Sequence, residues 1–281
     1  MKRLLCSLLC ALSGTGHADA LKIHASPAVA QAIASVANPL RDEGVELKIV
    51  NEGGSTAAIY AVGARAADVA LTTRKLNASD RAAAPDRRFE EFQIGVQVVA
   101  VIVPRDVWES GVRSLTRAQL LRIYEGEITN WKEVGGEDRK IRFYNSDRGR
   151  GIWEIFVQWL YGDPRKAPLG KFEVLIGGED ASNTIEFNAG SIGLAAPRWV
   201  DGKGTFALAL KDDAAEAADP SLPNLAAGKY PLTRPAMLIF GTRPAGPSRR
   251  LVEFMLSQPG QELIRKSDLV PITEVHPVPA Q

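Results

Sequence analysis

The sequence predicts an α/β protein with two connected domains. A short β-branched strand followed by a polar turn and a helix occurs at residues 47–63, and similar units occur at 21–40 and 141–161. Repeated strand–helix units favour a parallel sheet covered by helices. The β-rich run 92–104 is too long for one ordinary strand, which indicates that the chain crosses there between domains. At 281 residues the chain is large enough for two domains.

The composition is that of a globular protein with a balanced surface. Apolar residues make up 45% of the chain and charged residues 24%, and 34 Lys and Arg face 33 Asp and Glu. Such a balance provides no overall field that would attract nucleic acid or an anionic membrane. We therefore expect neither as a partner.

Residues 1–20 have the features of a secretory signal peptide. A basic start is followed by the apolar run 4–12 and a small-residue segment that ends at Ala20. We expect cleavage after Ala20, with Ala18 as the alternative, and export to the periplasm. The apolar run is too short to span a bilayer.

Both cysteines lie inside this leader. Cys6 and Cys10 would therefore be absent from the mature chain, which excludes a disulfide framework and a thiol-based metal site or nucleophile. The leucine pairs before each cysteine lack the small residues of a lipoprotein cleavage site, so a lipid anchor is not favoured.

The first domain begins with two strand–turn–helix units. Strand 21–25 leads into Ser26 and Pro27, which we interpret as the N-cap and first turn of a helix that ends near residue 40. Strand 47–50 leads through a glycine turn into a second helix. Parallel strands end at one edge of their sheet, and ligands of open α/β sheets bind at that edge.

The turn of the second unit predicts an anion site. Gly54, Ser55 and Thr56 lie where a helix begins, so several backbone N–H groups point towards one place. Thr73 and Arg74 follow the next strand and bring a hydroxyl and a guanidinium towards it. The alternative is an ordinary strand–turn–helix in which Ser55 is only the N-cap.

The elements of the second half follow the same pattern. A helix is expected at 115–123, with Ser114 or Thr116 as its cap, and the strand 141–144 runs into a loop with two arginines and then a helix. Further strands are expected at 190–195 and 236–240. The helix 249–265 is interrupted at Pro259 and Gly260, which indicates two helices.

Several segments resemble the periplasmic phosphate-binding proteins of phosphate ABC transporters. Residues 115–131, LTRAQLLRIYEGEITNW, are similar to the L-T-x-x-Q-L-x-x-I-F-x-G-x-I-T-N-W segment of that family. Gly190-Ser191-Ile192-Gly193 is similar to its G-A-I-G-Y strand, and residues 230–235 and 254–261 also match. The resemblance covers nearly the whole mature chain.

The resemblance implies a two-lobe type II periplasmic binding protein fold. Each lobe would be a mostly parallel sheet flanked by helices, with the ligand in the cleft between the lobes. Lobe I would comprise 21–97 and 195–281, and lobe II 98–194. The implied protein is a monomer that binds phosphate or a similar oxyanion and delivers it to the membrane subunits of an ABC transporter.

The resemblance also implies a set of ligand-binding residues. In the first lobe Ser26, Ser55, Thr73 and Arg74 match the family pattern, although Pro27 replaces a threonine and can donate neither a backbone N–H nor a hydroxyl. In the second lobe Ser146 replaces the usual Arg, Arg150 a Ser, and Ile152 a Thr. The candidate residues of this loop are Ser146, Arg148, Gly149, Arg150 and Gly151.

These departures leave two interpretations open. Arg150 could restore a charge-assisted contact with the oxyanion, or it could point to solvent in a second lobe that no longer binds phosphate. In the latter case the fold would serve another ligand, or a sensing or protein-interaction role. An enzyme is disfavoured, because the mature chain has only His24 and His276 and neither an H-E-x-x-H nor a G-x-S-x-G motif. No cofactor or metal is expected.

Overall fold

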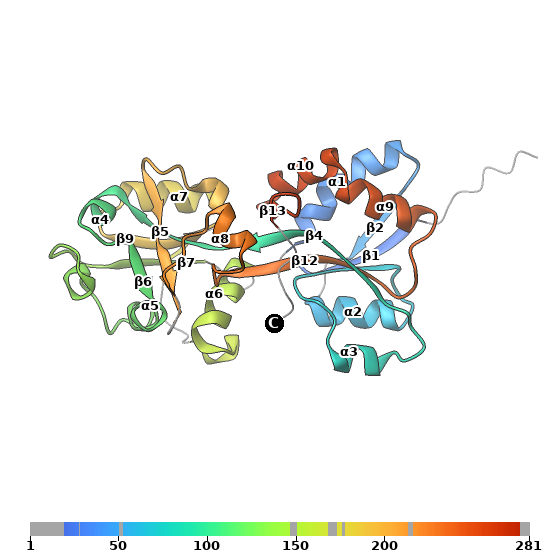
Figure 1. Cartoon of the computed structure of the whole chain (residues 1–281), viewed down its shortest axis with the longest axis horizontal. Helices are drawn as coiled ribbons and strands as arrows, with labels where there is room; N and C mark the ends of the chain where they lie inside the picture. Colours follow the sequence, from blue (N-terminus) through green and yellow to red (C-terminus); the bar gives the residue numbers. More distant parts are fainter. Residues whose placement is uncertain are drawn as a thin grey trace, which may run out of the picture.

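Two lobes lie side by side and are connected by extended strands (Figure 1). The computed structural model describes residues 20–27, 29–50, 53–146, 151–167, 173–175, 178–212 and 216–275. Each lobe contains one main sheet with helices on both faces, so the expected two-lobe α/β fold is confirmed.

The sheet of the first lobe has six strands. Their order is β13-β4-β12-β3-β1-β2. In that order the strands comprise Leu269–Pro271, Glu90–Val98, Thr233–Phe240, Val69–Thr72, Leu21–Ala25 and Leu47–Val50.

The parallel half of this sheet places the ends of two strands together. β1 pairs parallel with β2 and β3, and Ala25 lies beside Leu71. The backbone N–H of Ser26 donates to the carbonyl of Leu71 at 2.8 Å. Ser26 and Thr73 therefore emerge at the same carboxyl edge, as the sequence predicted.

Helices cover the two faces of the first sheet separately. On one face α1, α9 and α10 pack on a cluster that includes Ile33, Leu251 and Ile264. On the other face α2 packs on Met237 and Ile239 of β12, and α3 lies beside α2 (Figure 1). These helices comprise Ala30–Asp42 (α1), Ser55–Gly63 (α2), Ala78–Ala83 (α3), Pro247–Leu256 (α9) and Gln258–Lys266 (α10).

The start of α1 differs from the prediction. The helix begins at Ala30, its N-cap is Val29, and no side chain caps it. The carbonyl of Ser26 instead accepts the N–H of Val29 at 3.0 Å in a turn. Ser26 is therefore not the N-cap, because the turn delays the helix and leaves the serine at the edge of the sheet.

The second lobe has a five-stranded sheet and a short ribbon. The sheet order is β10-β5-β9-β7-β8, and β11 pairs with β6. The strands comprise Thr205–Ala207 (β10), Ala100–Pro104 (β5), Ser191–Ala195 (β9), Arg142–Ser146 (β7), Glu173–Leu175 (β8), Ala209–Lys211 (β11) and Ser114–Thr116 (β6). The helices comprise Arg105–Glu109 (α4), Arg117–Tyr124 (α5), Gly151–Tyr161 (α6), Gly178–Phe187 (α7) and Leu222–Ala226 (α8), and three 3-10 turns comprise Trp131–Val134, Pro164–Lys166 and Pro197–Trp199.

Local helix signals in the second half are confirmed. Thr116 is the N-cap of α5, and its hydroxyl accepts the N–H of Gln119 at 3.1 Å while the Gln119 side chain accepts the N–H of Thr116 at 2.9 Å. The reciprocal pair is a capping box. The C-terminal helix is two helices, as expected, but the break falls at Ser257, and Pro259 and Gly260 lie in the first turn of α10.

The predicted crossing between lobes is also confirmed, although each sheet is mixed. The run 92–104 divides into β4 of the first sheet and β5 of the second, with Val99 between them. Both β4 and β12 join the first sheet antiparallel, and β5 joins the second antiparallel. The parallel arrangement that we expected therefore covers only part of each sheet.

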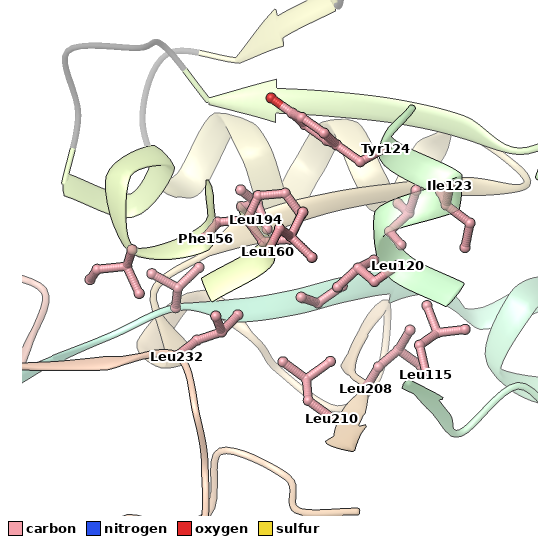
Figure 2. Close-up of a cluster of buried hydrophobic side chains, with 14 of the residues drawn as sticks. Leu115, Leu120, Ile123, Tyr124, Phe156, Leu160, Leu194, Leu208, Leu210 and Leu232 are labelled. Atoms are coloured by element: carbon pink, nitrogen blue, oxygen red, sulfur yellow. The ribbon is translucent and has the colours of Figure 1, made fainter. Parts of the chain in front are cut away.

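Strand pairing favours a later return to the first lobe than residue 195. β10 pairs with β5, and β11 pairs with β6. Leu208, Leu210 and Leu232 lie in the same apolar cluster as Leu115 and Leu120 of the second lobe (Figure 2). We therefore propose that lobe II spans about residues 98–232 and that lobe I resumes at β12.

Gly190 provides a test of this packing. Its φ is +72°, and a Cβ at this position would lie 2.5 Å from the carbonyl oxygen of Lys140. Its own carbonyl accepts the indole N–H of the buried Trp131 at 2.9 Å. We expect Gly190→Ala to lower the free energy of unfolding by about 2–4 kcal/mol, measured by urea denaturation.

The matched control is Gly202→Ala. Gly202 has a similar φ of +66°, but nothing lies within 4 Å of an added Cβ. Gly202→Ala should lower the free energy of unfolding by about 1–2 kcal/mol, because only the left-handed backbone conformation is penalised. An equal decrease in the free energy of unfolding for the two variants would contradict a role for the close approach of Gly190 to Lys140.

Candidate oxyanion-binding cleft

The first-lobe wall of the site is a pair of linked hydroxyls. The Ser55 Oγ accepts the backbone N–H of Thr73 at 3.0 Å, and the two hydroxyl oxygens lie 3.2 Å apart. Thr73 is buried, with 7% of its surface exposed, whereas Ser55 is half-buried. The start of α2 is thereby joined to the end of β3, two elements that the sequence predicted to meet.

The N-terminus of α2 is not capped by a side chain. Its N-cap is Gly54, and α2 begins at Ser55. The preceding Gly53 has a φ of +68°, which favours glycine and sets the turn. Ser55 is thus not the N-cap, because its hydroxyl bonds to Thr73 instead. Gly54, Ser55 and Thr56 line the cleft, so the positive end of the helix dipole lies at its wall.

The guanidinium of Arg74 is held in place by a carboxylate. It donates to both oxygens of Asp80, at 2.5 and 3.0 Å, and to the Thr56 hydroxyl at 3.2 Å. The hydrogen bond from Arg74 keeps the pKa of Asp80 below its ordinary value. Because Thr56 Oγ1 accepts from Arg74, its own hydrogen can donate to a ligand. Arg74 therefore orients a donor as well as contributing charge.

A cavity of about 720 Å³ opens in front of these groups. Glu154 and Gln158 of α6 line it from the second lobe, and Arg234 lines it from β12. The first-lobe residues that line it are Ser26, Pro27, Gly53, Gly54, Ser55, Thr56, Thr73 and Arg74. The cavity thus brings together all six candidate residues of the first lobe.

Arg234 and Glu154 form an ion pair across the cleft, 3.2 Å apart. Burial lowers the pKa of Arg234, and the neighbouring Glu154 opposes this effect. A desolvated guanidinium in the cleft can contact an oxyanion strongly, since little water screens it. The sequence did not single out Glu154, Gln158 or Arg234. The only signal for Arg234 was its place in the 230–235 motif.

The second-lobe candidates are placed differently. Ser146 ends β7 and Gly151 begins α6; both are buried, and neither lines the cavity. Arg148, Gly149 and Arg150 lie outside the described residues. The side chain of Asn145 accepts the N–H of Ser146 at 2.9 Å. That contact orders the end of the strand at the start of the predicted loop.

A buried tyrosine hydroxyl connects the two ends of that loop. Tyr124 Oη accepts the Asn145 side-chain N–H at 2.9 Å and the Trp153 indole N–H at 3.3 Å. Asn145 lies in β7 and Trp153 in the first turn of α6. The hydroxyl therefore positions the residues that flank the predicted loop.

Comparison with known proteins places the chain in a family. Two lobes that enclose an anion-suited cleft are typical of solute-binding proteins. A family model described as a PBP superfamily domain matches residues 13–258. Because this match spans most of the chain, the protein belongs to the PBP superfamily.

Relatives and solved structures point in the same direction. The phosphate-binding protein PstS of Bacillus subtilis is 24% identical over 261 residues, which cover 91% of this chain and 81% of that protein. An ABC-type phosphate transport receptor from Vibrio cholerae is 26% identical, with a TM-score of 0.70 over 89% of this chain and 99% of the other. The resemblance found in the sequence is confirmed.

A second solved structure has lower sequence identity. It is a possible phosphate-binding protein from Planctomyces limnophilus, with a TM-score of 0.76 and 19% identity over 91% of this chain and 94% of the other. At this identity the comparison supports the fold. In the described part of the chain, no helix is long and apolar enough to cross a membrane.

The first site prediction concerns Tyr124. We expect Tyr124→Phe to lower the free energy of unfolding by about 1–3 kcal/mol, because two buried N–H groups lose an acceptor. The measurement is urea denaturation. Tyr161→Phe is the control, since its hydroxyl donates to Glu125 in an exposed contact of 3.0 Å and should contribute less than about 1 kcal/mol. A larger decrease in the free energy of unfolding for Tyr161→Phe than for Tyr124→Phe would refute the role given to the Tyr124 hydroxyl.

The second prediction concerns pH. The lowered pKa of Asp80 means that its charged form is favoured in the folded state, so its contribution is present above the unfolded pKa of about 3.9 and is lost below it. The stability difference between wild type and Asp80→Asn should be constant from pH 5 to 7 and should shrink below about pH 4. A difference that grows on acidification would contradict the Arg74–Asp80 contact.

Proposed function

We propose that this protein binds phosphate, or a closely similar tetrahedral oxyanion, in the cleft between its lobes. The observation that carries the proposal is the set of neutral donors aimed into one cavity. Thr56 has an O–H group that Arg74 leaves available, and α2 presents its uncapped N-terminus. An oxyanion is the ligand that such donors stabilise best.

The hydroxyls of Ser55 and Thr73 add a further donor. Ser55 Oγ already accepts the N–H of Thr73, so its hydrogen can point to Thr73 Oγ1. The hydrogen of Thr73 is then directed to the ligand. In this arrangement the hydroxyls of Thr56 and Thr73 accept within the protein and donate to the anion, which matches an acceptor-rich ligand.

The charged groups complete the site. Arg234 supplies a partly desolvated guanidinium from the strand that links the lobes. We propose that Arg148, Gly149 and Arg150 supply the second-lobe donors, with Arg150 replacing the hydroxyl that the family has there. Backbone N–H groups and a guanidinium suit a tetrahedral anion.

The transport role follows from the named relatives. A phosphate-binding protein and a phosphate transport receptor are the proteins to which the chain is similar. We propose that this protein acts as a monomer outside the cytoplasm, in the periplasm after removal of residues 1–20, and delivers its ligand to an ABC transporter. Its activity is binding rather than catalysis, and no group of His, Cys, Asp and Glu among the described residues could hold a metal ion.

Isothermal titration calorimetry tests the proposal. Residues 21–281 titrated with inorganic phosphate should release or absorb heat with 1:1 stoichiometry. Ser55→Ala should weaken binding at least tenfold, about 1.4 kcal/mol, because Thr73 loses the acceptor that positions its donors. The absence of binding to phosphate, sulfate, arsenate and organic phosphates alike would refute the proposed function.

The matched control is Ser35→Ala. Ser35 lies on α1 of the same lobe, outside the cavity, and its hydroxyl donates to the carbonyl of Ala32 at 2.8 Å. The affinity of the Ser35→Ala variant for phosphate should equal that of the wild type. If both serine variants weakened binding equally, the effect would come from general destabilisation of the lobe.

A further inference from the structure

A second cavity adjoins the first and extends the cleft. It has a volume of about 620 Å³ and shares Thr73, Arg74, Gln158 and Arg234 with the first cavity. The two cavities are therefore neighbouring chambers of one cleft, separated at the level of the two arginines. Both lobes and the linking strand contribute to the walls of each chamber.

The size of this cleft exceeds the needs of inorganic phosphate. A water molecule occupies roughly 30 Å³ of liquid, so an ion of five heavy atoms needs on the order of 100 Å³. The first chamber of about 720 Å³ already accommodates such an ion. Chambers of several hundred cubic ångströms are typical of sites for organic ligands.

The second chamber has an apolar wall with a fixed aromatic ring. Trp159 of α6 is half-buried, and its indole N–H donates to Asp212 at 3.3 Å. Ile155 lies one turn earlier on α6, and Pro231 and Pro235 form the side towards the linking strand. A ring held by its N–H and flanked by rigid prolines presents a preformed surface for a carbon skeleton.

The three arginines around the second chamber are each paired with a carboxylate, and Lys75 also lines the chamber. Arg117 lies 3.8 Å from Asp212 and also donates to the carbonyl of Leu160 at 3.1 Å. Arg74 pairs with Asp80, and Arg234 pairs with Glu154. This chamber therefore lacks the excess of oriented donors that the first chamber offers to an anion. It suits an uncharged or zwitterionic group with a few polar atoms.

We propose that the ligand is a small phosphate monoester or phosphonate. Its phosphoryl group lies against Ser55, Thr56 and Thr73 in the first chamber, and its organic substituent lies against Trp159 in the second. This inference rests on the proposed function and specifies the class of oxyanion. Trp159 and the Asp212 that anchors it determine the preference for an organic substituent over bare phosphate.

The experiment compares inorganic phosphate with three organic probes by calorimetry on residues 21–281. The probes are sn-glycerol 3-phosphate, O-phosphoethanolamine and 2-aminoethylphosphonate. At least one organic probe should bind tenfold tighter than inorganic phosphate. Trp159→Leu should reduce that preference at least fivefold and change the affinity for inorganic phosphate less than twofold, because the ring contacts only the substituent.

Two further variants test whether the effect of Trp159→Leu is specific to the second chamber or comes from misfolding. Asp212→Ala removes the anchor of the indole at a half-exposed position, so it should reduce the preference in the same direction without loss of the fold. Trp108→Leu makes the same substitution on α4 of the same lobe, where the ring stacks on Phe206 outside both cavities, and should leave the preference unchanged. Thermal melting confirms that each variant is folded.

The outcomes separate the two proposals. If inorganic phosphate binds and no organic probe binds tighter, the inference about the second chamber is wrong and the proposed function stands. Equal weakening of both ligand types by Trp159→Leu also overturns the inference. If neither phosphate nor any organic probe binds to the folded wild-type protein, the proposed function itself is wrong.

Discussion

The whole structure depends on the contact between the two segments that cross between the lobes. Val99 separates β4 from β5, and its N–H donates to the carbonyl of Leu232 at 3.0 Å. Its carbonyl accepts the hydroxyl of Tyr230 at 2.8 Å, in a buried position where desolvation raises the pKa of the tyrosine. The hydroxyl therefore stays protonated and keeps donating. Since the outgoing and returning strands are joined here, this contact sets where the residues of each lobe meet in the cleft.

The chemistry of the cleft follows from this arrangement. The first lobe offers neutral donors, and their orientation is imposed by N–H groups that their oxygens accept: the guanidinium of Arg74 donates to Thr56, and the backbone N–H of Thr73 donates to Ser55. Such groups need little reorganisation when an anion arrives. Arg234 adds a second guanidinium to that of Arg74; it lies two residues beyond the Leu232 contact and so belongs to the linking strand.

The sequence predicted the features that depend on local signals. The crossing at 92–104 followed from the length of an apolar run, and Thr116 was one of two cap candidates by residue type. The meeting of Ser55 with Thr73 followed from the rule that parallel strands end at one edge. Each of these signals lies within a short segment or follows from strand order alone. For that reason no long-range contact had to be known in advance.

Features that arise from tertiary packing could not be predicted in this way. Glu154 and Arg234 are 80 positions apart in the chain and meet only because α6 faces the linking strand. The three-residue strands β10 and β11 are too short to show an alternating pattern, so they carried no sequence signal for the later return to the first lobe that we propose. Ser26 fits an N-cap by type, but its carbonyl makes a turn with Val29.

The position of β12 has a consequence for how the protein folds. β12 lies between β3 and β4 in the first sheet, with pairs to both, so that sheet remains divided until residues 233–240 have been made. Nearly all of the second lobe's main apolar cluster is already present by residue 232. During synthesis or export from the N-terminus, the lobe that begins later in the chain can therefore form first. The lobe that begins earlier must wait for its central strand, with its apolar edges exposed in the meantime.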